Sequence, residues 1–300
     1  MKQYFIWSIA AFSLLFTAHA QERPQFTQYL YNPANVNAAY VGTLEGFTFT
    51  GGYRSQWTGI DEAPNSLSFM AEQRLSEQIG LGLSVVNDDF GPTSNTDISA
   101  HFAYAVPLND RIKMRFSLSA SGNFFALDTD ELTIADQEVF FTDLDNSFSP
   151  NVGVGFLIHD DRWFFGLSAP TLLSATDDDI APGFRTRSSV FNVMGGYHIP
   201  LSEDWALRPS FLLQQITDSP FLYNLTTQVT FKDRFHFGVN YRNDKAISGL
   251  AGIAITPNIG LGYSYDYYTD ALGDIANGAH EIYIRFKLSP TTTNTFIGRN

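Results

Sequence analysis

The strongest constraint on the fold is an alternation of apolar and polar residues that recurs along most of the chain. Residues 111–127, RIKMRFSLSASGNFFAL, are a clear example, because Met114, Phe116 and Leu118 are separated by single polar residues. A period of two places the apolar side chains on one face of a β-strand and the polar side chains on the other. The fold class depends on whether the apolar face contacts a protein core or lipid.

The same alternation predicts fourteen strands between residues 46 and 288. They are expected at 46–57, 65–76, 79–88, 96–107, 111–125, 150–159, 162–172, 188–199, 205–216, 221–232, 234–242, 246–256, 258–268 and 280–288. No window has a convincing helical period, and no linker or change of composition divides the chain. We therefore expect one all-β unit.

The connections between the predicted strands alternate in length. Every second one is tight, as at 108–110, whereas most of the others are longer, as at 89–95, 126–149 and 173–187. Only the short connection at 243–245 breaks the pattern. Tight turns at one end and longer loops at the other are typical of an outer-membrane barrel with an even number of strands.

The first twenty residues have a different character. MKQYFIWSIAAFSLLFTAHA combines an early lysine, an apolar run and a small-residue site, and so predicts a secretory signal peptide cleaved near Ala20–Gln21. A membrane anchor is the alternative, but the run is short for a span. No later stretch contains the roughly 20 apolar residues that a spanning helix needs. An exported chain of this kind can enter a membrane only as a β-barrel.

The two faces of the predicted strands favour lipid as the contact of the apolar face. In the last strand Ile284 and Phe286 share one face, and Arg285 and Lys287 share the other. Aromatic residues gather near strand ends, as in the girdles of membrane barrels. A soluble β-sandwich also alternates, but it explains neither the export signal nor the sorted loops. We predict a transmembrane antiparallel up-and-down β-barrel of about fourteen strands.

This prediction divides the chain into four parts. Residues 1–20 are the signal peptide, 21–42 an extended N-terminal segment that forms a plug or lies on the rim, 43–288 the barrel, and 289–300 a C-terminal tail. A barrel of this size encloses a lumen wider than side chains alone fill. Water, a loop, residues 21–42 or the tail of a partner must occupy it.

The sequence does not predict catalytic, cofactor-binding or metal-binding residues. Its formal net charge of −13 disfavours nucleic acid, and it has no cysteine. No histidine has metal-ligand spacing, and the acidic run at 177–179 lacks the pattern of a calcium loop, so a solvated loop is the simpler interpretation. Ser99 and His101 share a strand face, which any residues two apart do, so a hydrolase is only a third hypothesis.

Four segments together resemble the PorP/SprF family of type IX secretion system membrane proteins. They are PQFTQYLYNPANVNAAYVG at 24–42, YRSQW at 53–57, GLGLSVVNDDFGPTSNT at 80–96 and GAHEIYIRFKL at 278–288. The resemblance implies an outer-membrane β-barrel without enzymatic activity that serves protein secretion, gliding motility or surface adhesion. Some members are core components of the secretion apparatus, and others are thought to hold the C-terminal domain of one large secreted protein at the cell surface.

The chain departs from the family pattern in two places. Residues 38–40 read Ala-Ala-Tyr where the family usually has Pro-Ala-Tyr. The chain also continues for twelve residues beyond Leu288, although barrels usually end on an aromatic residue. Either Phe286 serves as the assembly signal, or the tail adds a contact.

We expect partner recognition at the mouth of the barrel, on the second loop and at the end of the first strand. The candidate partner-binding residues are Arg54, Trp57, Asn87, Asp88, Asp89, Gly91, Pro92 and Asn95. Two of them have plain structural alternatives: Arg54 could instead form a lumenal ion pair with Glu72, and Gly91–Pro92 could be a simple turn. The expected partners are outer-membrane lipid, the C-terminal domain of a secreted protein, and components of the secretion machinery.

A passive porin for small solutes is the alternative function. A hydrated lumen with several arginines could conduct anions. The arginines predicted to face the lumen are Arg54, Arg115, Arg208, Arg242 and Arg285.

Overall fold

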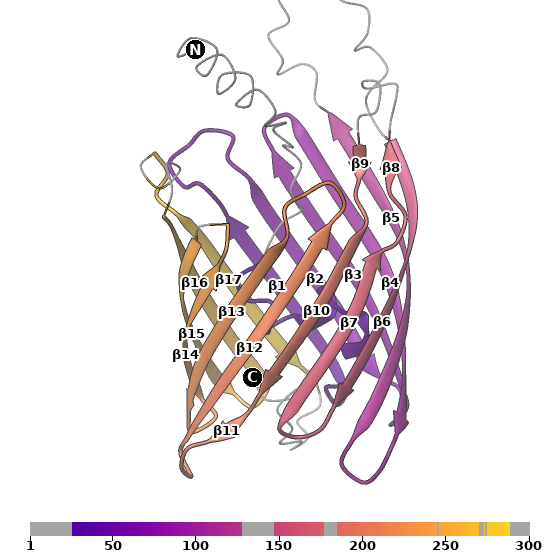
Figure 1. Cartoon of the computed structure of the whole chain (residues 1–300), viewed down its shortest axis with the longest axis vertical. Helices are drawn as coiled ribbons and strands as arrows, with labels where there is room; N and C mark the ends of the chain where they lie inside the picture. The colour runs from indigo at the N-terminus through magenta and orange to yellow at the C-terminus, as the bar shows by residue number, and fades with distance from the viewer. Residues whose placement is uncertain are drawn as a thin grey trace, which may run out of the picture.

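The alternating strands close into one antiparallel β-barrel whose tilted strands form a cylinder (Figure 1). This is a computed structural model, and it describes residues 26–127, 147–176, 185–244, 246–269, 273 and 275–288. The signal peptide and the C-terminal tail predicted from the sequence lie outside the described residues, as do most of the two longest predicted loops.

The wall of the barrel consists of fourteen strands among the described residues. They are β1 (Phe47–Ser55), β2 (Asn65–Arg74), β3 (Ile79–Phe90), β4 (Thr93–Pro107), β5 (Lys113–Leu127), β6 (Ser147–His159), β7 (Trp163–Thr171), β10 (Val190–Tyr197), β12 (Trp205–Ile216), β13 (Leu222–Phe231), β14 (Phe235–Arg242), β15 (Ala246–Thr256), β16 (Ile259–Tyr268) and β17 (Ala279–Lys287). Strands that follow one another in the wall are paired, and the pairing of β1 with β17 joins the first strand to the last.

Three short strands lie outside this ring. The two-residue strand β11 (Ile199–Pro200) extends the turn before β12, and β8 (Ala175–Thr176) pairs with β9 (Arg185–Arg187) between β7 and β10. Because β10 pairs directly with β12, none of the three contributes to closure of the barrel. The predicted fold class and strand number are confirmed.

One predicted loop is wrong. Residues 89–95 were expected to be a long loop, but β3 and β4 continue to Phe90 and Thr93 and meet in a two-residue turn. Gly91 has a φ of +52°, which glycine adopts without steric cost, and Pro92 follows with its fixed negative φ. This sequence suits a type II′ hairpin, which continues the twist of the two strands.

The two ends of the barrel differ, and we name them by their connections. The turn end carries the short turns after β2, β4, β6, β13 and β15, and the loop end carries the connection after β1 and the long segments between β5 and β6 and between β7 and β10 (Figure 1). In outer-membrane barrels the short turns face the periplasm and the longer loops face outward. The loop end is accordingly the outer end.

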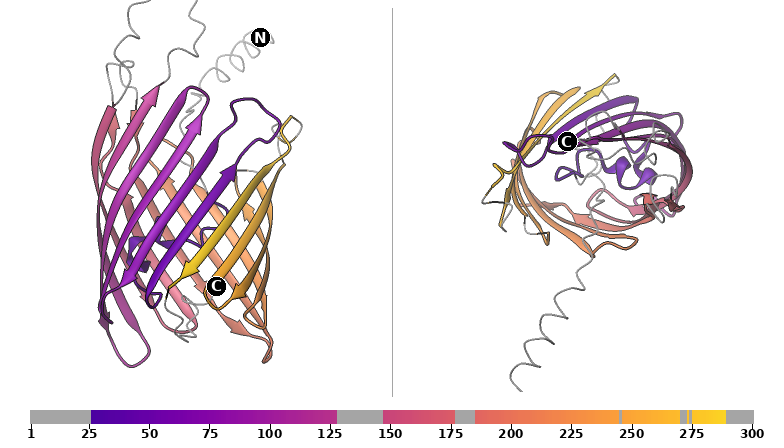
Figure 2. Two further views of the ribbon diagram at one scale, coloured as in Figure 1. Left: turned by 180° about the vertical axis from the view of Figure 1, so that it is seen from behind. Right: turned by 90° about the horizontal axis from the view of Figure 1, so that it is seen from above.

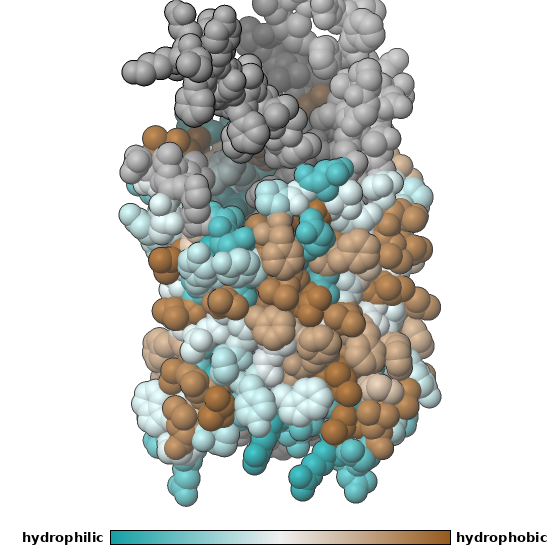
Figure 3. Space-filling view, in the orientation of Figure 1, coloured by the Kyte–Doolittle hydropathy of each residue, from teal (hydrophilic) through white to brown (hydrophobic). Residues whose placement is uncertain are grey.

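The apolar faces of the strands point away from the lumen. Leu118 and Val239 have 63% and 62% of their side chains exposed, whereas Arg54 and Arg115 are buried inside the ring. Apolar side chains cover much of the outer wall between more polar ends (Figure 3). A wide apolar surface of this kind is stable only against lipid, so the apolar faces contact the membrane.

Among the described residues, no helix has both the length and the apolar character needed to cross a bilayer.

A charge on the lipid-facing side of β5 is expected to destabilise the barrel strongly. Leu118 lies near the middle of β5 with its side chain outward, so Leu118→Arg should lower the free energy of unfolding by about 2–4 kcal/mol. Leu108→Arg, in the turn after β4 and also half exposed, should cost at most about 1 kcal/mol because it lies near the interface. Urea unfolding from lipid vesicles measures both values, and equal costs would contradict a lipid-facing β5.

Candidate functional site

The lumen of the barrel is occupied by the segment that precedes β1. Residues 26–42, which we call the plug segment, lie inside the ring when the barrel is viewed along its axis (Figure 2). The buried apolar residues of this segment pack on apolar residues of the wall: Ala39, Tyr40 and Val41 belong to one core cluster with Met70 and Leu157. The apolar core of this barrel therefore lies between the plug segment and the inner wall.

Local sequence explains why the plug segment is compact rather than extended. It contains two 3-10 helices, η2 (Pro33–Asn35) and η3 (Ala38–Tyr40). Pro33 suits the first position of a helix because its φ is fixed and it has no N–H to satisfy there. Asn37 caps η3, and its side-chain oxygen accepts a hydrogen bond from Ala39 N at 3.0 Å. The extended conformation expected from the sequence is thus wrong for residues 33–40.

An arginine of β5 binds the middle of the plug segment. Arg115 Nε donates to Ala39 O at 2.8 Å, and Arg115 Nη2 donates to Val41 O at 2.6 Å. On the opposite flank, Asn37 Nδ2 donates to the backbone carbonyl of Phe156 at 2.9 Å. Hydrogen bonds to a charged donor are among the stronger ones, so the plug segment is held by the wall and does not merely fill space.

The turn-end side of the plug segment is fixed by β2. The Arg74 guanidinium donates to Gly42 O at 3.0 Å and to Thr43 O at 3.0 Å, and it forms an ion pair with Glu45 at 3.2 Å. Glu72 accepts a hydrogen bond from Gly42 N at 2.9 Å. The chain is thus anchored where it leaves the lumen and enters β1.

The loop-end side is fixed by a buried charge cluster. Arg54 forms ion pairs with Asp266 at 2.6 Å and with Glu281 at 2.9 Å, and all three side chains are 0% exposed. Glu281 also accepts hydrogen bonds from the backbone N–H groups of Thr27 and Gln28 at 2.8 and 2.9 Å. The predicted pairing of Arg54 with Glu72 is wrong, because Arg54 lies opposite Glu281 in the register of β1 with β17.

Close approach of the plug segment to β3 requires glycine. A Cβ atom added to Gly80 would overlap the carbonyl oxygen of Val41 and lie 2.7 Å from its carbonyl carbon. Since both clashing atoms belong to the backbone, no side-chain movement relieves the contact. Gly249 is a matched control on β15, because a Cβ there meets nothing within 4 Å.

We therefore expect Gly80→Ala to loosen the plug segment and Gly249→Ala to leave it in place. The chain has no cysteine, so Ala39→Cys supplies a single thiol at a position that is 0% exposed. Maleimide should label this thiol slowly in the Ala39→Cys protein and equally slowly when Gly249→Ala is added. Adding Gly80→Ala instead should make labelling about tenfold faster, because overpacking at Gly80 costs about 1–3 kcal/mol. Equal labelling in all three proteins would argue against a tightly packed plug segment.

A cavity lined by both polar and apolar side chains lies on the loop-end side of the plug segment. The cavity has a volume of about 150 Å³. Its floor includes Tyr29, Asn32 and Asn35 of the plug segment. Its polar wall residues are Ser84 and Asp88 of β3, Asn95, Asp97, Ser99 and His101 of β4, Ser119 and Ser121 of β5, Thr171 of β7, Asn192 of β10, Gln214 of β12 and Asn224 of β13.

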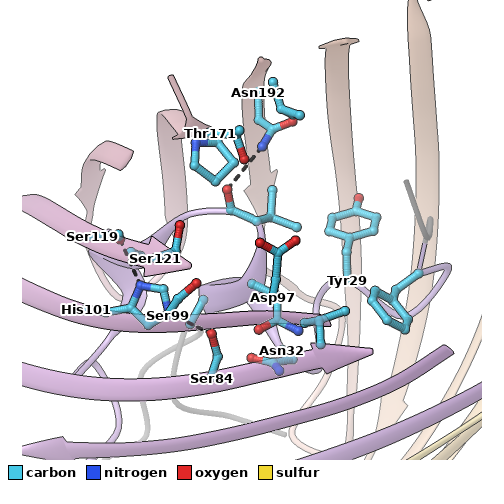
Figure 4. A pocket seen from close by; sticks show the side chains of 18 of the residues that line it. Tyr29, Asn32, Ser84, Asp97, Ser99, His101, Ser119, Ser121, Thr171 and Asn192 are labelled. Carbon is cyan, nitrogen blue, oxygen red and sulfur yellow. Dashed lines mark hydrogen bonds between the residues drawn. The ribbon is translucent and has the colours of Figure 1, made fainter. Parts of the chain in front are cut away.

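The histidine of this cavity is held by serines and not by a carboxylate. One ring nitrogen of His101 is 2.9 Å from Ser84 Oγ, and the other is 2.8 Å from Ser119 Oγ (Figure 4). With both ring nitrogens hydrogen-bonded to hydroxyls, neither bonds the carboxylate that orients the histidine in a serine hydrolase. Ser99 shares a strand face with His101, but the two hydroxyls that bond the His101 ring belong to Ser84 and Ser119.

The predicted partner-binding residues on β3 and β4 divide between two surfaces. Asp88 and Asn95 face the lumen and line the cavity. Asn87 and Asp89 lie on the outer face of the hairpin, where Asn87 Nδ2 donates to Ser94 Oγ at 3.2 Å, and Ser94 Oγ donates to Asp89 at 2.6 Å. Polar side chains on the outer face show that this hairpin extends beyond the apolar band of the wall.

The remaining predicted residues support the rim of the barrel. Gly91 and Pro92 form the turn, and Gly91 N donates to Glu62 O at 3.1 Å. The Trp57 ring packs edge-to-face on Phe90 with 5.5 Å between centroids. Arg54 is fully buried and is not exposed at the mouth.

Most of the polar residues that line the cavity were not among the candidates predicted from the sequence. Asp97, Ser119 and Asn192 all lie on the polar faces of predicted strands. Alternation identifies such faces, but it does not indicate which lumenal residues remain clear of the plug segment. Within the part of the chain that is described, no group of three histidine, aspartate or glutamate side chains is placed to hold a metal ion.

Three solved structures are similar to the chain at low sequence identity. The Acinetobacter baumannii outer membrane protein Omp33 has a TM-score of 0.49 at 9% identity, covering 82% of this chain and 100% of Omp33. The CymD monoaromatic hydrocarbon channel has a TM-score of 0.47 at 13% identity, covering 89% and 94%. The NanC porin has a TM-score of 0.42 at 13% identity, covering 81% and 100%. No curated protein sequence matches the chain.

A family match extends over nearly the whole chain. The profile of the type IX secretion system membrane protein PorP/SprF matches residues 18–286. The matched region includes the plug segment and all strands of the wall up to the last residues of β17. The chain therefore belongs to the PorP/SprF family of type IX secretion system membrane proteins.

Proposed function

We propose that this protein is a non-enzymatic outer-membrane barrel that assists secretion of a large protein, anchors that protein at the cell surface through its C-terminal domain, or does both. The observation that carries the proposal is the plug segment, which occupies the lumen and leaves a cavity with two carboxylates on the loop-end side. A barrel closed in this way presents a binding surface to the outside without offering a path for solutes. The family membership supports a role in type IX secretion.

The porin alternative is less well supported because three of the five arginines predicted to face the lumen are engaged. Arg115 binds the backbone of the plug segment, and Arg54 is paired with Asp266 and Glu281. Arg242 forms an ion pair with Asp244 at 2.7 Å. Anion conduction would require these groups to face open water, and it would also require displacement of the plug segment.

A crosslinking pull-down from native outer membranes tests the proposal. A tagged copy is crosslinked, purified and analysed by mass spectrometry. Recovery of one large exported protein supports anchoring, and recovery of lipoprotein and ring components of the secretion machinery supports a core role. A barrel recovered with neither would overturn the proposed function and favour the porin.

A further inference from the structure

The loop-side cavity has an unusual distribution of charge for a lumen that contains several arginines. Among the described residues that line it, Asp88 and Asp97 are the carboxylates, and none is lysine or arginine. Arg115 and Arg74 bind the plug segment below the cavity, and Arg54 belongs to the buried cluster. The cavity is therefore negative, and a cation would neutralise it.

The floor of the cavity carries amide groups without partners. Asn32 is 4% exposed, and its Nδ2 has no hydrogen-bond partner. Neither the Nδ2 nor the Oδ1 of Asn35 has a partner. Both side chains line the cavity, as Figure 4 shows for Asn32. Buried amides without partners are uncommon in folded proteins, and they mark places where a ligand or water completes the hydrogen bonding.

The two observations together specify the chemistry of a ligand. The negative charge of the two carboxylates favours a positively charged ligand, and Asp88 also accepts a hydrogen bond from Ser66 Oγ. The unpartnered amide atoms of Asn32 and Asn35 require hydrogen-bond acceptors and donors. A polypeptide that carries a lysine or arginine has both, because its backbone supplies carbonyl and N–H groups close to the charged side chain. A metal ion would satisfy the carboxylates but not the amide donors.

We propose that the loop-side cavity binds a lysine- or arginine-bearing segment of the secreted partner, inserted from the loop end. Asp88 and Asp97 neutralise the positive side chain, and Asn32 and Asn35 bind the backbone of the segment. The plug segment stops the inserted segment at this depth. This inference rests on the proposed function, since it names the chemistry by which an exported protein is held.

Binding of short peptides to the purified full chain in detergent tests the inference. The probes are the capped pentapeptides Gly-Ser-Lys-Ser-Gly, Gly-Ser-Gln-Ser-Gly and Gly-Ser-Glu-Ser-Gly, measured by isothermal titration calorimetry. The lysine peptide should bind tightest, and Asp97→Asn or Asp88→Asn should weaken it by about thirtyfold because each removes one side of a charge pair. Asn32→Ala should weaken all peptides that bind. Equal binding of the three peptides would overturn the inference.

Two controls show whether a loss of peptide binding comes from the cavity itself or from misfolding of the variant. Asp110→Asn makes the same chemical change at an exposed residue in the turn after β4, and it should leave peptide binding unchanged. Heat-modified migration on a gel reports whether each variant is folded. Lysine-peptide binding by a barrel that recovers neither an exported protein nor the secretion machinery would overturn the proposed function and leave only the preference of the cavity for a cationic peptide. Recovery of an exported protein with no preference for lysine would overturn this inference alone.

Discussion

Replacing residues 27–41 with a flexible glycine-serine linker is expected to turn a closed barrel into a conducting pore. The plug segment supplies much of the apolar core inside the ring, and its removal leaves a lumen lined by polar side chains. Conductance in planar bilayers should rise by about tenfold or more, because fourteen strands enclose more space than side chains alone fill. Single-channel recording of the full chain and the linker variant measures the change.

The comparison of the full chain with the linker variant needs controls for correct folding and for background conductance of the bilayer. Asp110→Asn keeps the plug segment and should conduct as little as the full chain. Heat-modified migration on a gel should report a folded barrel for all three proteins. Stable conducting steps from the full chain would contradict closure by the plug segment, and so would a folded linker variant without conductance.

Arg54→Ala is expected to be among the most destabilising single substitutions in the protein. It leaves Glu281 buried without its ion-pair partner and leaves Asp266 with only a longer pair to Arg242, at 3.6 Å; both carboxylates are 0% exposed. Removing one member of a buried ion pair costs about 3–5 kcal/mol, since the remaining charge is uncompensated. Denaturant unfolding from lipid vesicles measures the loss.

Two further variants test whether uncompensated buried charge causes that loss of stability. Adding Asp266→Asn and Glu281→Gln to Arg54→Ala removes the stranded charges and should recover a large part of the lost stability. Lys232→Ala breaks an exposed pair with Asp204, 3.9 Å long, and should change stability by at most about 1 kcal/mol. A mild effect of Arg54→Ala, or no recovery in the triple variant, would show that burial of charge is not the cause.

The wall of the barrel could be predicted from the sequence because a membrane barrel requires alternation at every strand. Strands β12 (Trp205–Ile216) and β15 (Ala246–Thr256) begin and end where the alternation does. The prediction failed at the hairpin of β3 and β4, where Asn87, Asp88 and Asp89 are polar on both faces. Beyond the apolar band a strand has water on both sides, so hydrophobic alternation no longer reports strand structure.

The interior could be predicted only in part. Alternation placed Arg54 on the inner face, but several carboxylates share that face, and only closure of β1 on β17 selects Glu281 over Glu72. The plug segment has no hydrophobic period, because its conformation depends on contacts with Arg115, Glu72 and other wall residues distant in sequence. The cavity depends in turn on where the plug segment stops, which no local pattern encodes.

Site-specific photocrosslinking in living cells tests the central claim, that a closed barrel holds an exported protein at its loop end. A photoreactive amino acid is placed at Asn95 in the cavity and, as a control, at Asp110 in a turn at the opposite end. We predict that Asn95 gives an adduct with one large exported protein and that Asp110 does not. No adduct from Asn95 in a folded barrel, or the same adduct from both ends, would contradict the account.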